Sequence, residues 1–225
     1  MGTSKGYITP TTPKWSNAKR GVTAFTGNPS LLNKKEASSR FAKAIKADDK
    51  TIPNTSVVFS NIASFVSTSK TKGLKQALEE YDKSYINDLS PEEALNELIN
   101  SFCEGNTIDD VLANNCISEA LDVLEIDSLD DLSTIDINEL IKELTCQFAT
   151  QKFAQSFDKH IREKCDSIIV ANERLKDIQD YIYYTLKNSL TTDKLDLINP
   201  HNLASEQIII DIINEAFSIL ENYYE

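Results

Sequence analysis

Apolar side chains recur every three or four residues from about residue 30 to the end of the chain, with polar side chains between them. This spacing places the apolar side chains on one face of an α-helix, because an α-helix has 3.6 residues per turn. No stretch alternates apolar and polar residues with the period of two that indicates a half-buried strand. The pattern predicts an all-α protein with helices at about 31–47, 55–70, 74–86, 91–103, 108–125, 137–189 and 203–224.

Local signals place several helix ends. Ser90-Pro91 supplies a capping hydroxyl followed by proline at the first helical position, and Thr107 precedes an acidic first turn. Pro53 lies in a polar run that is expected to separate two helices, and Asn199-Pro200 marks the last break. Asn172 is a candidate kink in the long stretch 137–189.

The first 29 residues differ from the rest. They hold four of the six glycines and three of the six prolines, a composition that opposes helix formation. We therefore expect a nonregular, basic, Gly/Pro/Thr-rich N-terminal tail at 1–29 and a single all-helical domain at 30–225. Spaced aromatic residues, including the only tryptophan, Trp15, indicate that the tail lies along a surface of this chain or of a partner.

Charge is distributed unevenly. Residues 1–75 carry 13 Lys and Arg against 3 Asp and Glu, a net charge of +10, whereas residues 76–225 carry a net charge of −22. A basic arm of this kind can seek nucleic acid or another acidic surface. We favour the other interpretation, that it binds the acidic remainder of its own chain, which is present at high effective concentration.

Other classes of protein are not favoured. No apolar run approaches the ~20 residues that a membrane-spanning helix needs, and no secretory signal is evident. We expect a cytoplasmic protein without membrane association. The four cysteines, Cys103, Cys116, Cys146 and Cys165, are far apart and form no CxxC pair, so buried free thiols are expected.

Catalytic signals are weak. The two histidines are His160 and His201. His160 precedes Cys165 by five residues and would point to a different helix face, and His201 lies in a predicted break. No nucleotide-binding or zinc motif is present. The sequence predicts a non-catalytic protein with no metal and no cofactor.

Nucleic-acid binding is an alternative. Lysines and arginine at positions 5, 14, 19 and 20 offer phosphate contacts, and Tyr7, Trp15 and Phe25 offer stacking. The acidic remainder of the chain would repel the same ligand, so nucleic acid is an unlikely partner by charge.

The opening Met1-Gly2-Thr3-Ser4, the Gly6-Tyr7 step and the Pro13–Trp15 segment together resemble the start of the QatB proteins of the Qat anti-phage defence systems. A Gly-Gly-Pro step associated with that family is Ile8-Thr9-Pro10 here. The resemblance implies a bacterial protein that works beside an ATPase, a QueC-like enzyme and a TatD-like nuclease. It also implies that the QueC-like enzyme attaches a deazaguanine group to the amine exposed by loss of the initiator methionine.

The resemblance implies that Gly2 is the modified N-terminus. It also implies that a tail after Gly2 binds a partner through Thr3, Ser4, Lys5, Gly6, Tyr7 and Trp15. Glycine at position 2 permits removal of the initiator methionine, and the freed amine has an ordinary pKa near ~7.7–8.0. Myristoylation of Gly2 is a competing modification, but its pattern requires Ser or Thr where this chain has Gly6.

Overall fold

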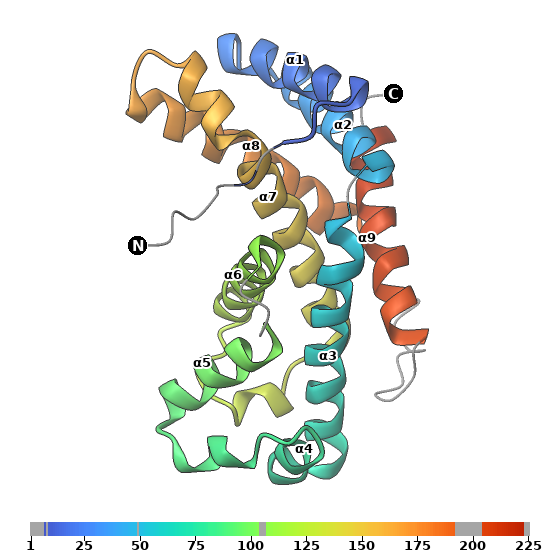
Figure 1. Cartoon of the computed structure of the whole chain (residues 1–225), viewed down its shortest axis with the longest axis vertical. Coiled ribbons are helices and arrows are strands. Elements are labelled where there is room, and N and C mark those ends of the chain that lie inside the picture. The colour runs from blue at the N-terminus through green and yellow to red at the C-terminus, as the bar shows by residue number, and fades with distance from the viewer. Residues whose placement is uncertain (1–6, 8, 49, 104–106, 192–203, 223–225) are drawn as a thin grey trace. The chain divides into compact units, whose positions relative to one another are not determined.

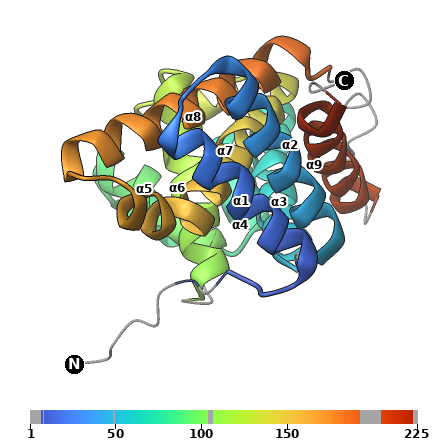
Figure 2. The ribbon, with the colours of Figure 1, turned by 90° about the horizontal axis from the view of Figure 1, so that it is seen from above.

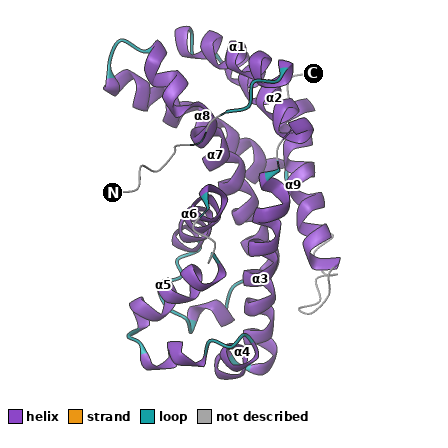
Figure 3. Ribbon diagram, viewed as in Figure 1, coloured by secondary structure: helices purple, strands orange, loops and turns teal. Residues whose placement is uncertain are grey.

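A computed structural model of the chain describes residues 7, 9–48, 50–103, 107–191 and 204–222. Within these ranges the backbone forms helices joined by turns and loops, and it contains no strand (Figure 3). The predicted all-α fold class is therefore confirmed for the described part of the chain.

The chain groups into two compact units. The first contains residues 1–50, 148–190 and 214–225, and the second contains residues 51–147 and 191–213. Helices α7 (Ile137–Lys164) and α9 (Ala204–Asn222) each contribute residues to both units. The division of the chain into a tail at 1–29 and one domain at 30–225 stays a prediction.

Helix α1 (Pro13–Gly27) corrects the expectation of nonregular backbone through residue 29. Pro13 occupies the first turn, where its missing N–H costs nothing and its fixed φ suits a helix. The glycines of this helix are tolerated because its apolar face is buried, and tertiary packing outweighs intrinsic propensity. That face consists of Trp15, Ala18, Val22 and Phe25, which are all fully buried.

Helix α2 (Leu31–Asp48) packs against α1, and the two lie side by side in both the front view (Figure 1) and the view from above (Figure 2). The two helices approach each other closely at Gly21. A Cβ atom on Gly21 would lie 3.2 Å from Ala37 Cα and 2.9 Å from Arg40 Cδ. The absence of a side chain at Gly21 thus lets the two helix backbones come together.

An aromatic cluster forms the core of the first unit around Phe41 of α2. Its ring centroid is 5.2 Å from that of Phe153 and 6.3 Å from that of Trp15, both in edge-on geometry. Phe157 and Phe217 lie at 5.9 and 5.8 Å. Edge-to-face contacts at these separations stabilise beyond the area that they bury. The cluster therefore joins α1 and α2 to the end of α7 and the end of α9.

The long stretch predicted at 137–189 is two helices. Helix α7 ends at Lys164, and α8 (Ile168–Ser189) begins after Ser167, whose side chain accepts a hydrogen bond from Val170 N. The break lies before the expected kink at Asn172. A serine that caps a new helix outweighs the continuing apolar periodicity on both sides of it.

The second unit begins with α3 (Thr51–Lys72). Pro53 lies in its first turn and not between two helices, which corrects the sequence interpretation for the same reason as at Pro13. The following elements are α4 (Leu74–Glu80), η1 (Ser84–Asp88), α5 (Pro91–Phe102), α6 (Ile108–Val123) and η2 (Asp131–Ser133).

Capping in the second unit follows the sequence signals. Ser90 precedes α5 and its backbone N–H and hydroxyl both donate to Glu93. Thr107 precedes α6 and exchanges hydrogen bonds with Asp110 in the same way. Reciprocal bonds of this kind satisfy donors that would otherwise be unpaired at a helix start. The predicted starts of α5 and α6 are confirmed.

Candidate functional site

The N-terminal segment that precedes α1 is seated on helix α7. Thr9 Oγ1 donates a hydrogen bond of 2.8 Å to the carbonyl oxygen of Ser156. One turn earlier on the same helix, the ammonium of Lys152 lies 4.3 Å from the centroid of the Tyr7 ring. We call Tyr7, Thr9, Lys152 and Ser156 the tail seat.

Lys152 is unusual because its side chain is fully buried. Its ammonium donates to Gln155 Oε1 at 3.1 Å and also faces the Tyr7 ring. A buried ammonium costs free energy unless hydrogen bonds or an aromatic face replace its water. The Tyr7 ring thus contributes to the compensation of the Lys152 charge, and this contact favours the position of Tyr7 on α7.

Beside the tail seat, a hollow of about 330 Å³ is lined by Thr11, Lys19, Lys159 and Glu163, among others. It combines cations, a carboxylate and hydroxyl groups on a surface that the N-terminal segment borders.

His160 connects α7 to α1 at the edge of this hollow. Its Nε2 lies 2.8 Å from Thr23 Oγ1. Because the Thr23 hydroxyl already donates its proton to Lys19 O, Oγ1 accepts from the Nε2–H group of His160. Partial burial lowers the pKa of His160, and the positive charges of Lys164 and Lys19 lower it further. His160 is therefore held neutral as a structural donor between the two helices.

The sequence-predicted residues have different outcomes. Gly2, Thr3, Ser4, Lys5 and Gly6 lie outside the described residues, as does His201. Tyr7 lies against Lys152 of α7, and its assignment to a partner-binding tail stays a prediction.

Trp15 is fully buried in the aromatic core, so its assignment to the partner-binding tail is corrected. A tryptophan on the apolar stripe of α1 stabilises its own chain and is not accessible to a partner. Phe25 is fully buried on the same stripe. Neither ring is available to stack on a nucleic-acid base, which removes two of the three aromatic contacts that the alternative requires.

Sequence reasoning missed Thr9, Lys152 and Ser156. A signal for Lys152 does exist, because it follows Phe148 by four residues and so shares the helix face of a core aromatic residue. Nothing in the sequence marks Thr9 or the Ser156 carbonyl, since that hydrogen bond joins residues 147 positions apart.

The basic N-terminal third does pair with acidic residues of its own unit. Lys34 of α2 forms an ion pair with Asp177 of α8, and Lys46 forms one of 3.0 Å with Glu221 of α9. These pairs agree with the interpretation that the basic segment docks on the chain's own acidic surface.

All four cysteines are free thiols, as predicted, but only Cys116 and Cys146 are buried. Cys103 and Cys165 are half-buried. Burial, with the nearby charge of Asp110, raises the pKa of Cys103 to about 11, and burial raises the pKa of Cys116 as well. Both thiols are therefore poor nucleophiles at neutral pH.

The described ranges hold neither a candidate metal centre nor a membrane-spanning helix. There, no group of three His, Cys, Asp or Glu side chains is placed to hold a metal ion. No helix in the described part of the chain is long and apolar enough to cross a membrane.

Comparison with known proteins identifies the family. The family model for the Qat anti-phage system associated protein QatB matches residues 49–220. No curated protein and no solved structure matches the chain. The matched span begins after α2, so it is independent of the N-terminal residues whose pattern resembles the family. On this match over most of the chain, the protein belongs to the QatB family of the Qat anti-phage system.

Proposed function

We propose that this protein is a non-catalytic component of its Qat system that presents Gly2 to a QueC-like partner enzyme, which modifies it. The helical body serves as the platform that docks the enzyme. Membership of the QatB family supplies the anti-phage context. The modification and the identity of the partner are the proposal.

The tail seat is the observation that carries this proposal. It holds Tyr7 and Thr9 against α7, so the residues that precede Tyr7 are tethered at this position of α7. A chain that begins at Gly2 has five residues before Tyr7. An extended chain covers at most ~3.3–3.6 Å per residue, so the partner's active site must lie within about 20 Å of Tyr7.

The chemistry of the N-terminal amine of Gly2 suits the covalent attachment of a group by an enzyme. An α-amino group with an ordinary pKa of ~7.7–8.0 is partly neutral at cellular pH, and the neutral amine is the nucleophile. Glycine has no Cβ atom to obstruct a narrow active site. A seat on α7 would reduce the entropy that the partner must remove in order to bind the terminus.

Intact mass spectrometry tests the proposal on protein made with and without the QueC-like partner. We expect loss of Met1 in both samples and a mass adduct on Gly2 only with the partner. Gly2→Leu should retain Met1 and lose the adduct, whereas Gly2→Ala, which is also small, should lose Met1 and keep a reactive amine. Both variants should show the circular dichroism of the parent.

Two results would overturn the proposal. One is the absence of any adduct on protein purified together with an active QueC-like partner. The other is full anti-phage protection by the Gly2→Leu protein.

The ATPase and the TatD-like nuclease of the Qat system are further expected partners. The expected location of the protein is the bacterial cytoplasm.

A further inference from the structure

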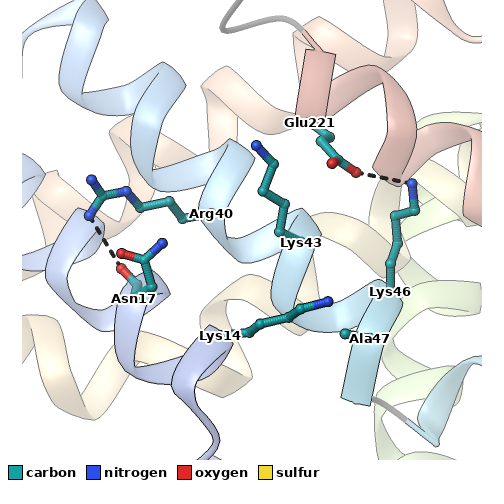
Figure 4. Close-up of a pocket in the computed structure, with 7 residues that line it drawn as sticks. All are labelled: Lys14, Asn17, Arg40, Lys43, Lys46, Ala47 and Glu221. Carbon is teal, nitrogen blue, oxygen red and sulfur yellow. Dashed lines mark hydrogen bonds and ion pairs between the residues drawn. The ribbon is translucent and has the colours of Figure 1, made fainter.

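A basic pocket lies in the first unit, between α1, α2 and the end of α9. It has a volume of about 390 Å³, and Figure 4 shows the seven residues that line it. Four of the seven are cationic and one is acidic. The cations are Lys14 of α1 and Arg40, Lys43 and Lys46 of α2, and the acid is Glu221 of α9.

Two of the cations are already engaged. Arg40 pairs with Glu36 and donates to Asn17 O, and its guanidinium turns toward Asn17 (Figure 4). Lys46 donates to Glu221 Oε2 and to Ser218 Oγ, each at 3.0 Å. These contacts hold the walls of the pocket in place.

The other two cations, Lys14 and Lys43, make no hydrogen bond or ion pair with any residue that the structure describes. Figure 4 shows Lys14, Lys43 and Lys46 on different sides of the same space. Like charges on neighbouring side chains repel one another where carboxylates are fewer than cations, and a bound anion reduces that repulsion. The described residues that line this open pocket thus carry a surplus of positive charge.

The lining selects the kind of anion. Lysine binds phosphate as a point charge, and the planar fork of Arg40, which would suit carboxylate and phosphate alike, is already occupied. None of the described residues that line the pocket is aromatic, so they offer a nucleobase no ring to stack on. The volume is within the range of ~300–1,000 Å³ that small-ligand sites occupy.

We propose that this pocket binds a chain of phosphate groups, as found in inorganic tripolyphosphate or in a nucleoside triphosphate, through Lys14 and Lys43. The described residues that line the pocket include none of the tail seat, so this proposal does not depend on the function proposed above.

Isothermal titration calorimetry of the full chain with sodium tripolyphosphate tests the proposal. We expect saturable binding of one anion per chain that weakens as salt rises. Lys14→Gln with Lys43→Gln should weaken binding at least about tenfold, because two charge-assisted hydrogen bonds are lost. The matched control is Lys50→Gln with Lys75→Gln, which removes the same charge from exposed positions outside the pocket and should bind as the parent does.

Titrations with other anions distinguish a nucleotide from an inorganic source of the phosphate chain, and phosphate from other classes of anion. ATP should bind about as tightly as tripolyphosphate and AMP much more weakly, because the phosphate chain is what the pocket contacts. Equal binding of AMP and ATP would overturn the proposal. So would preference for a single-stranded DNA oligomer or a hexaglutamate peptide over tripolyphosphate, or an equal loss of affinity in the control variant.

Discussion

The ammonium of Lys152 lies 4.3 Å from the centre of the Tyr7 ring, and this contact joins the N-terminal segment to a buried charge in α7. A cation over an aromatic face contributes about 0.5–2 kcal/mol, more when the cation is desolvated. The contact between the Tyr7 ring and the Lys152 ammonium is therefore expected to stabilise the tail seat.

This relationship predicts the behaviour of Tyr7 variants. Tyr7→Leu removes the ring face and should loosen the segment, so that trypsin cuts within residues 1–14 faster than in the parent. Tyr7→Phe keeps the ring face and should be cut at the parental rate. Equal cleavage of Tyr7→Leu and the parent would show that the contact does not hold the segment.

The aromatic core predicts a large loss of stability at Phe41. Phe41→Ala should lower the free energy of unfolding by about 3–5 kcal/mol, because it leaves a cavity among the surrounding rings. Leu32→Ala on the same helix should have little effect, since Leu32 is 61% exposed. Urea unfolding measured by the emission of Trp15, the only tryptophan, reports on this unit directly.

The close approach of α1 and α2 predicts opposite outcomes for two glycines. Gly21→Ala should destabilise by about 1–3 kcal/mol, because the new Cβ atom meets the backbone at Ala37. Gly27→Ala meets nothing within 4 Å and should be neutral or stabilising by up to about 1 kcal/mol. Thermal unfolding of the two variants provides the comparison, and equal shifts would contradict the close approach.

His160 predicts a dependence of stability on pH. Its pKa is lower in the folded protein than the ordinary value of 6.5, so the unfolded chain binds more protons between those two values. The contribution of His160 to the free energy of unfolding is fully present above about pH 7.5. It is lost as the pH falls through the pKa that His160 has in the folded protein. The neighbouring charges act in both directions, since Lys164 and Lys19 lower the pKa and Glu163 raises it.

His160→Gln keeps a donor for Thr23 but removes the titration. Its free energy of unfolding should therefore fall less than that of the parent between pH 7.5 and pH 5.5. Urea titrations at several pH values measure this difference. A steeper fall in the variant would mean that His160 is protonated, and not neutral, in the folded protein.

The sequence alone determined the helical class and the starts of α5 and α6. Both depend on local physics, since a 3.6-residue apolar period and a capping residue act within a few turns of the same helix. The sequence also carried a helical stripe at Trp15, Ala18, Val22 and Phe25, although the surrounding glycines and prolines indicated a nonregular tail. Ser167 was a further local signal, obscured by apolar periodicity on both sides of it.

Tertiary structure decided the rest, because it brings together residues that are distant along the chain. Whether Trp15 lies in a core or on a surface depends on Phe41 and Phe157, which belong to other helices. The tail seat and the basic pocket arise in the same way, from residues as far apart as Thr9 and Ser156 or Lys14 and Glu221. Local periodicity cannot predict such long-range contacts, because they form only when the helices pack.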